Sequence, residues 1–144
     1  SAVKGPMELS TTKVPSGEEV LSLYNSVGWS AYTDQPEVLF EGLKNSACAI
    51  YAYDDEHQLV GLVRVVSDNA TICYVQDILV RPSAHRSGVG RALFSAVQAK
   101  YEHVRQLVLI TDDEPGQLAF YESMGLTEGS DFRPGVIRTF AKFS

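Results

Sequence analysis

The chain has 144 residues, of which 44% are hydrophobic and 21% are charged, as is ordinary for a soluble globular protein. Its formal net charge of -6 argues against nucleic acid as a partner, because binding nucleic acid requires a basic face. No apolar run approaches the roughly 20 residues that a membrane span needs, so we expect no membrane partner.

Six residues, SAVKGP, precede Met7, and we interpret residues 1–6 as the remnant of an expression tag. No apolar segment of a signal peptide follows them. Residues 7–144 contain neither repeats nor a linker, so we predict one domain, which is long enough to bury a core.

Two helices are predicted before the first strand. Residues 16–27 begin with Ser16 as the capping residue, carry two glutamates at the positive end and place apolar side chains on one face. A polar and aromatic loop over 29–35 leads into a second helix over 36–44, with Pro36 in its first turn.

Turn sequences separate the next strands, and we predict that they pair as antiparallel neighbours: 47–53, 59–66 and 71–80. A helix that ends near Tyr101 then leads to a continuous apolar strand at 106–111, predicted to be buried on both faces. A helix over 115–124 and a last strand over 136–142 complete a mixed α/β sheet with a strand–helix–strand crossover.

The two cysteines, Cys48 and Cys73, lie in apolar, strand-like segments. Buried, reduced thiols are typical of a cytoplasmic protein, and we expect that location. The three histidines do not have the spacing of metal ligands, so no metal site is predicted.

The segment HRSGVGRALF places Gly88 and Gly90 at the start of a predicted helix, where each costs about 1 kcal/mol relative to alanine. A turn explains one glycine but not two. A dinucleotide-binding loop needs a third glycine where Leu93 stands, and the Gly-Lys-Ser/Thr of a Walker loop is absent. A third interpretation is a phosphate site, in which backbone N–H groups at the helix N-terminus and two flanking arginines attract an anion.

The segment DILVRPSAHRSGVGRAL resembles motif A of the GNAT acetyltransferase superfamily, in which a strand and a turn lead into Q/R-x-x-G-x-G/A at a helix start. Further along, AFYESMGL resembles motif B, typically A-x-x-F-Y-x-x-x-G-F. The order of elements is similar to that family from about Glu18 onward. His85 stands where Gln or Arg is usual, and Glu114 and Gln117 depart from motif B. The resemblance implies the GNAT fold, a central, mostly antiparallel sheet with a β-α-β crossover and flanking helices.

The resemblance also implies acetyl-CoA as the acetyl donor. In such proteins the strand equivalent to 76–80 binds the pantetheine arm through its backbone and diverges from the strand equivalent to 106–111. Amides of the following loop hold the pyrophosphate. The residues that the resemblance assigns to acetyl-CoA are Ile78, Leu79, Val80, His85, Arg86, Ser87, Gly88, Val89, Gly90 and Arg91.

Acetyl transfer from a thioester to an amine requires a neutral amine, hydrogen-bond donors at the thioester oxygen and a proton for the leaving thiolate. The backbone N–H of Ile78 is a candidate donor. The resemblance assigns the proton to Tyr121, which matches the motif B tyrosine that points at the CoA sulfur in many relatives. A phenol with an ordinary pKa of about 10 stays protonated at neutral pH. Helical spacing alone would place both Phe120 and Tyr121 in the core.

Asp77 is the candidate base. In YVQDILV the polar residues are Gln76 and Asp77, and strand alternation directs them to opposite faces, so one of them can face the acceptor. In the alternative interpretation Asp77 forms a structural ion pair with Arg64 or Arg81. Two further carboxylates remain candidates for the base: Asp34 and Glu41.

Aromatic side chains after the first helix and near the C-terminus can line a pocket for an aromatic or alkyl amine, or they can cover the edge of the core. The candidate acceptor residues are Trp29, Tyr32, Gln76 and Phe132. The leading hypothesis is an N-acetyltransferase for a small amine, with a homodimer as a possible assembly. The alternatives are a protein or peptide acceptor, a non-catalytic acetyl-CoA sensor and an interaction domain without a CoA site.

Overall fold

The computed structural model describes residues 7–144, so the interpretation of residues 1–6 as a tag remnant lies outside the described residues. The chain divides into two compact units, one that ends at Ile110 and one over Thr111–Ser144. The first unit contains the sheet and the glycine segment, and the second contains the helix of the AFYESMGL motif. A single domain over 7–144 stays a prediction.

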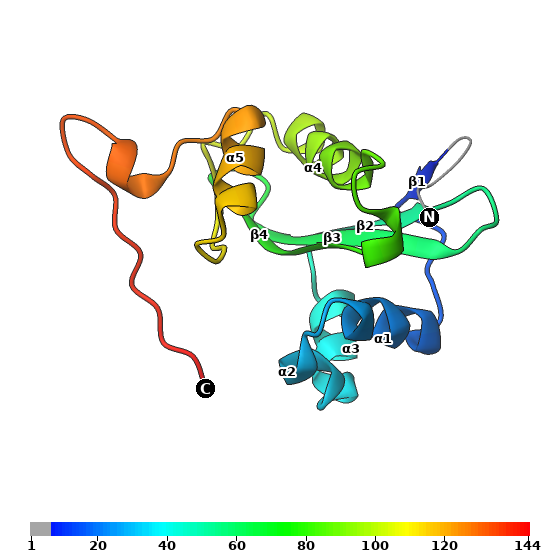
Figure 1. Cartoon of the computed structure of the whole chain (residues 1–144). Coiled ribbons are helices and arrows are strands. Elements are labelled where there is room, and N and C mark those ends of the chain that lie inside the picture. The colour runs from blue at the N-terminus through cyan, green and yellow to red at the C-terminus, as the bar shows by residue number, and fades with distance from the viewer. Residues whose placement is uncertain (1–6) are drawn as a thin grey trace. The chain divides into compact units, whose positions relative to one another are not determined.

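The first unit is built on a five-stranded sheet in which the strand order follows the chain. β1 to β4 pair as antiparallel neighbours, and β4 pairs with β5 in parallel after the crossover helix α4 (Val89–Lys100). This confirms the predicted mixed sheet and its crossover (Figure 1). The strands are β1 (Glu8–Ser10), β2 (Cys48–Tyr53), β3 (Leu59–Ser67), β4 (Ile72–Val80) and β5 (Gln106–Leu109).

Helices cover both faces of this sheet. α1 (Gly17–Ser26), α2 (Ser30–Thr33) and α3 (Pro36–Lys44) lie on one face, and α4 lies on the other (Figure 1). The predicted Ser16 cap of α1 is confirmed, since the Ser16 side chain accepts from the Glu19 N–H. Within residues 7–144, no helix combines the length and the apolar character needed to cross a membrane.

The segment over 29–35 is not the plain loop that we predicted, because it contains the one-turn helix α2. Backbone hydrogen bonds close this turn: the Asp34 N–H donates to the Ser30 carbonyl at 2.8 Å, and the Thr33 N–H donates to the Trp29 carbonyl at 3.3 Å. The turn holds the aromatic side chains of this segment against α1, which a loop would leave free to move.

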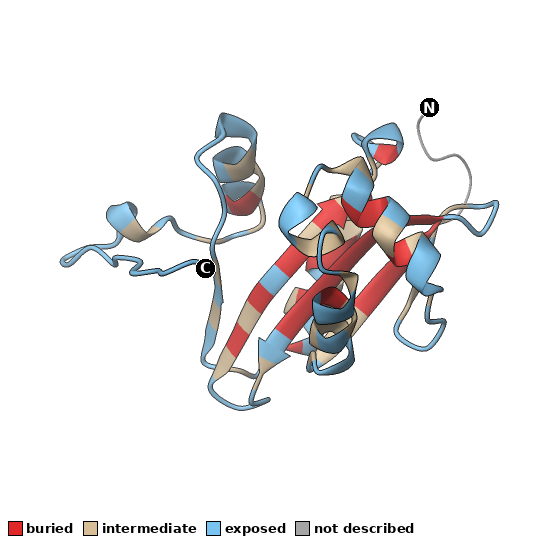
Figure 2. Ribbon diagram, turned by 90° about the horizontal axis from the view of Figure 1, so that it is seen from below, coloured by how far each residue is buried: buried red, intermediate tan, exposed pale blue. Residues whose placement is uncertain are grey.

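Buried residues gather on the strands of the sheet (Figure 2). The two faces of the sheet pack against different helices. One face packs against α1 and α3, in a cluster that includes Leu23, Leu39 and Leu62. On the other face the α4 side chains Val89 and Leu93 lie against the backbone of β3. Each face therefore buries an amphipathic helix or helices, which is the layered arrangement that α/β domains require.

Two of our strand predictions need correction. β5 is shorter than predicted, and it is not buried on both faces, because Val108 is 40% exposed and Ile110 is 47% exposed. β5 is the edge strand of the sheet and pairs with β4 alone, whereas a continuous apolar run suggested a central position. β1 escaped prediction because a three-residue strand is too short to show an alternating pattern.

The second unit contains α5 (Pro115–Ser123) and a short 3-10 turn at Gly129–Asp131. The helix matches the prediction, but the strand expected over 136–142 does not form in the described chain. Phe140 is 90% exposed and Phe143 is 84% exposed. Alternating apolar residues favour extended backbone, but a strand also needs a neighbour to bond its N–H and C=O groups, and this segment has none in the second unit.

We expect the substitution Gly61→Ala to lower the free energy of unfolding by about 1–3 kcal/mol, as overpacking of a core does. A Cβ at Gly61 would lie 2.8 Å from Val89 Cγ1 and 3.0 Å from Leu93 Cδ1, so these side chains, or α4 with them, would have to shift. Urea denaturation measures the loss. The control is Gly116→Ala, which adds a Cβ in open space within a helix and should be neutral or stabilising. Equal effects of the two substitutions would contradict the close approach.

Candidate functional site

The glycine segment forms the N-terminus of α4, as the sequence predicts. Gly88 is the N-cap residue with φ +88°, and the position of a Cβ there faces open space. In the described chain no side chain caps this helix, so the N–H groups of Val89 and Gly90 are left to an acceptor from outside the helix. Arg86 also has a positive φ, of 66°, and backbone that changes hand in this way forms concavities that bind anions.

Side chains of the preceding loop hold this segment in place. His85 Nε2 lies 3.0 Å from the Val80 carbonyl oxygen, and the Ser87 hydroxyl donates to the Ala84 carbonyl. Because both side chains bond the loop itself, an anion at this site would meet backbone amides together with the exposed Arg86 and Arg91. The side chain of His85, which stands where Gln or Arg is usual, thus bonds the backbone of its own loop.

The second half of β4 has one open edge. β4 and β5 pair only from Ile72 to Val75 on the β4 side, whereas β4 stays paired with β3 as far as Val80. Within the first unit, the segment 76–80 therefore has no strand neighbour on the β5 side. This is the divergence that the resemblance implied for the pantetheine arm, and it leaves the backbone groups on that side of 76–80 without a strand partner in the first unit.

A buried ion pair lies on the α1–α3 face of the sheet. Arg64 Nε of β3 donates to Asp77 Oδ2 of β4 at 2.6 Å, and the side chains are 8% and 3% exposed. Tyr24 of α1 donates its hydroxyl proton to Asp77 Oδ2 at 2.9 Å, and Tyr32 of α2 donates to Asp77 Oδ1 at 2.9 Å. The carboxylate therefore joins two strands to two helices.

The predicted opposite orientation of Gln76 and Asp77 is wrong. Both side chains bond the hydroxyl of Tyr32, with Gln76 Nε2 at 3.0 Å and Asp77 Oδ1 at 2.9 Å. The register of the β3–β4 pair shifts between Arg64 and Val65, so that Gln76 is an extra residue without a partner in the ladder. A bulge of this kind interrupts the alternation of side chains, and it brings neighbouring residues to the same side of the strand.

The electrostatics of the cluster follow from burial and pairing. Burial opposes the charge of Arg64, but the charge and hydrogen bond of Asp77 outweigh burial and raise the pKa of the guanidinium. Burial, followed by the negative charge of Asp77, raises the pKa of the Tyr24 phenol. Tyr24 thus stays a hydrogen-bond donor to Asp77. Of the two ion pairs that the sequence left open, the one with Arg64 forms, because Arg81 bonds the Leu59 carbonyl and Ser22 instead.

Three of the candidate acceptor residues come together in the first unit. Trp29 and Tyr32 pack with their ring edges near Tyr24, at centroid distances of 5.9 Å and 5.2 Å, and both are only partly buried. Gln76 is exposed and bonds Tyr32. The fourth candidate, Phe132, belongs to the second unit and is 38% exposed. Of the other carboxylates, exposed Glu41 bonds Asn45 and exposed Asp34 ends α2.

Tyr121 lies in α5 of the second unit and is buried. Burial, and to a lesser extent the nearby charge of Asp112, raises the pKa of its phenol to about 12. The ring stands edge-on to that of Phe120, with the centroids 5.1 Å apart. The phenol of Tyr121 therefore stays protonated throughout the neutral pH range, because its pKa is about 12.

Sequence reasoning missed two members of the buried cluster as functional candidates. Tyr24 belongs to the apolar face predicted for the helix over 16–27, and no nearby residue marks its hydroxyl as polar, since the hydrogen-bond partner is 53 residues away in the chain. Arg64 was named only as a partner of Asp77. The signal for Arg64 was present, because a charged residue inside the apolar run LVGLVRVV is buried only when it is paired.

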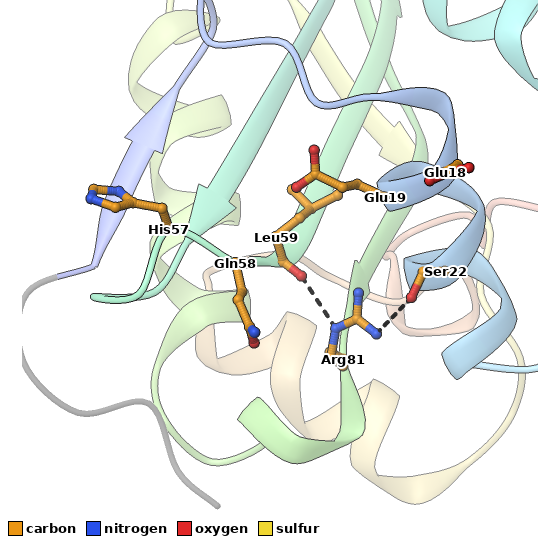
Figure 3. A pocket seen from close by; sticks show the side chains of 7 residues that line it. All are labelled: Glu18, Glu19, Ser22, His57, Gln58, Leu59 and Arg81. Atoms are coloured by element: carbon orange, nitrogen blue, oxygen red, sulfur yellow. Dashed lines mark hydrogen bonds between the residues drawn. The ribbon is translucent and has the colours of Figure 1, made fainter.

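A further cavity of about 370 Å³ lies beside the N-terminus of α1 (Figure 3). Arg81 points into it and is held by the Leu59 carbonyl and by the Ser22 hydroxyl, each at 3.2 Å. None of the candidate acetyl-CoA or acceptor residues lines it. The lining residues are Glu18, Glu19, Ser22, His57, Gln58, Leu59 and Arg81.

The chain matches the family described as acetyltransferase (GNAT) domain over residues 20–133. A relative from Gracilaria tenuistipitata var. liui, named "uncharacterized N-acetyltransferase ycf52", is 24% identical over 117 residues, which are 79% of this chain. The match spans 63% of that relative, so this chain covers less than two thirds of its length.

Solved structures agree in fold. A GNAT-family acetyltransferase from Streptococcus pneumoniae superposes with a TM-score of 0.79 and 28% identity, and the match covers 96% of this chain and all of the other. An aminoglycoside N-acetyltransferase, solved in complex with a bisubstrate analogue of CoA and acetylneamine, has a TM-score of 0.71 and 16% identity. That match covers 97% of this chain and 100% of the aminoglycoside enzyme, and at this identity it shows the fold alone.

We expect Asp77→Asn to lower the free energy of unfolding by about 3–5 kcal/mol, because it leaves Arg64 buried without its counter-charge. Chemical denaturation measures the loss. The matched control is Glu8→Gln, which breaks the exposed ion pair with Lys13 and should cost less than about 1 kcal/mol. A cost as small for Asp77→Asn as for Glu8→Gln would contradict the buried pairing.

Proposed function

The chain belongs to the GNAT acetyltransferase family, and from that premise we propose that it transfers the acetyl group of acetyl-CoA to the primary amine of a small molecule. One observation carries the proposal. The open edge of β4 and the glycine N-terminus of α4 lie at the two ends of a single loop, so one elongated ligand can bond both. A pantetheine arm with its amides suits the edge, and a pyrophosphate suits the helix N-terminus.

The residues present fit such a donor. We propose that the backbone of Ile78, Leu79 and Val80 faces the pantetheine arm. The ring of His85 already bonds the Val80 carbonyl, so the loop is shaped before the ligand arrives. The open space at Gly88 and its positive φ support close approach of a phosphate. The proposed contacts to the pyrophosphate come from the segment His85–Arg91, through the amides of Arg86, Ser87, Gly88, Val89 and Gly90 and the charges of Arg86 and Arg91.

The proposed reaction is a direct transfer. The lone pair of the neutral amine forms the new C–N bond at the thioester carbon, and the electron pair of the C–S bond leaves with sulfur. The nitrogen then loses one proton to solvent, and the sulfur takes one proton. We propose that Tyr121 supplies that proton and regains another from water, since its phenol is protonated below a pKa of about 12. The N–H of Ile78 is the proposed donor to the thioester oxygen.

The proposed acceptor site lies around Trp29, Tyr32 and Gln76, with Phe132 as a further candidate. Asp77 already accepts from three donors, so as a base it would have to exchange one of them for the amine, and its role as a base stays a prediction. A small amine is favoured over a protein acceptor because the aromatic rings of Trp29 and Tyr32 pack together rather than forming an open groove.

We expect acetyl-CoA and CoA, but not NAD or ATP, to raise the melting temperature of the wild-type protein. A ligand at a hundredfold excess over its Kd contributes about 2.7 kcal/mol of stability. Gly88→Ala should lose most of the shift, since a side chain at φ +88° is strained and obstructs the phosphate. Gly28→Ala is the control, with φ +76° and open space but outside the proposed site, and it should keep the shift. No shift of the wild type with either CoA species would refute the proposed donor.

We expect Tyr121→Phe to lower kcat by about a hundredfold or more, the usual contribution of a general acid. In the wild type, kcat should rise with pH as the amine loses its proton, without a descending limb between pH 7 and about 10, because the pKa of Tyr121 is about 12. A pH–rate profile of acetyl-CoA consumption measures both. Tyr53→Phe is the control, since the Tyr53 hydroxyl bonds only the Lys13 carbonyl in the described chain. An unchanged kcat in Tyr121→Phe would contradict its role as the proton donor, whereas no turnover by the wild type with any amine would favour the sensor hypothesis.

A further inference from the structure

We infer that the side-chain amide of Gln76 is held in one orientation, with its carbonyl oxygen presented to an N–H of the acceptor amine. Tyr32, Asp77 and Arg64 are the positioning residues that set this orientation. The inference rests on the proposed function and deepens it, because it names the atom that meets the amine and the residues that aim it. It also changes the role of Tyr32 from a substrate contact to a positioning residue.

The orientation follows from a chain of donors and acceptors that begins at Arg64. A guanidinium can only donate hydrogen bonds, and the carboxylate paired with it can only accept them. The Tyr32 hydroxyl lies 2.9 Å from Asp77 Oδ1, so its one proton is committed to Asp77. The lone pairs of that hydroxyl remain, and they accept from one Arg64 terminal nitrogen at 3.3 Å and from Gln76 Nε2 at 3.0 Å.

Gln76 must therefore turn its NH₂ group, not its carbonyl, toward Tyr32. The two ends of an amide have nearly the same shape, so the hydrogen-bond network decides which way it points. In the flipped orientation the Gln76 oxygen would face a hydroxyl whose only proton is already in use. The amide oxygen consequently points away from Tyr32. The Gln76 side chain is exposed, and among the described residues none donates a hydrogen bond to this oxygen.

The backbone places this oxygen beside the proposed acetyl donor. Gln76 is the extra residue of the β4 bulge, and it is also the first residue beyond the β4–β5 pairing, which ends at Val75. The bulge brings Gln76 to the same side as Asp77, where α2 meets the sheet. The open edge that we propose for pantetheine begins at the same residue.

A carbonyl oxygen at this position suits an amine in its reactive form. A neutral primary amine has two N–H donors and one lone pair. When the Gln76 oxygen accepts one N–H, the lone pair stays available for the thioester carbon. An amide carbonyl takes no proton at neutral pH, so Gln76 orients the acceptor and does not act as the base. Nitrogens without an N–H, such as quaternary ammonium groups, lose this contact.

A matched pair of substitutions tests the inference. Tyr32→Phe and Tyr24→Phe each remove one hydroxyl that donates to Asp77, but only Tyr32 bonds Gln76. The probes are benzylammonium chloride and benzyltrimethylammonium chloride, added to the CoA-saturated protein, with the ¹H–¹⁵N signals of the Gln76 side chain as the readout. The variant Gln76→Met, at an exposed position, assigns those signals by their disappearance.

We expect benzylammonium to shift the Gln76 signals in the wild type and in Tyr24→Phe, but not in Tyr32→Phe. Benzyltrimethylammonium should shift them in none of the three. With an acceptor amine identified by turnover, Tyr32→Phe and Gln76→Met should raise the KM for the amine about tenfold, the loss of one hydrogen bond, and leave the KM for acetyl-CoA unchanged. Tyr24→Phe should lose stability only.

Equal responses of Tyr32→Phe and Tyr24→Phe would overturn the inference, and so would equal shifts from the two ammonium probes.

Failure of the proposed function is distinguishable from failure of the inference. In ligand-free protein the NH₂ signals of Gln76 should be displaced from the positions of a free glutamine amide and exchange slowly with water in the wild type, and in Tyr32→Phe they should move to the free-amide positions and exchange faster. That result supports the fixed amide even where no CoA species binds, and its absence refutes it.

Discussion

A buried ion pair between Arg64 and Asp77 joins the central strands of the sheet to the helices on one of its faces. Charges so far from water are costly to bury, and an isolated pair of this kind adds little net stability compared with apolar residues. The contribution of this ion pair is to fix the positions and hydrogen-bond directions of its neighbours. Through the hydroxyls of Tyr24 and Tyr32, one carboxylate dictates where α1 and α2 lie on the sheet and which way each hydroxyl points.

On the opposite face of the sheet, α4 is held by close packing against β3. Gly61 of β3 has no side chain, and Val89 and Leu93 of α4 fill the space that one would take. α4 is therefore seated on the backbone of the strand next to β4. Since the N-cap of this helix is Gly88, the depth of a packing contact determines where the first-turn amides lie relative to the edge of β4. The contacts on the two faces thus position the two sides of the proposed site by different physical means.

Local sequence patterns were sufficient for most of the elements. The Ser16 cap, Pro36 in a first turn and the turn sequences between strands act over a few residues, and the structure contains the elements that they predict. The positions of Gly88 and Gly90 also predicted where α4 begins. Where partners are distant, the patterns failed. The segment over 136–142 has strand-like composition without a neighbouring strand, and Tyr24 finds its hydroxyl partner far along the chain.

The error at Gln76 and Asp77 has the same origin. Strict alternation holds only while each residue of a strand faces one residue of its neighbour, and a bulge is a property of the pair of strands. The candidate residues were thus identified from sequence, but their common orientation was not. The ion pair with Arg64 could be anticipated as one of two possibilities, because both arginines lie near strand positions that can face Asp77, and only the three-dimensional register separates them.

The open edge of β4 has a consequence for the behaviour of the protein in solution. Unpaired N–H and C=O groups along a strand are a template on which another chain can add a strand, and proteins usually block such edges with charges, prolines or covering loops. Under the proposed function this edge receives the amides of a ligand, so it cannot be blocked in these ways. The β4–β5 pairing, which ends at Val75, and the turn at Pro82 limit its length at the two ends. In the proposed function the bound donor also covers this edge, so solubility and shelf life should follow ligand occupancy more closely than they follow the free energy of unfolding.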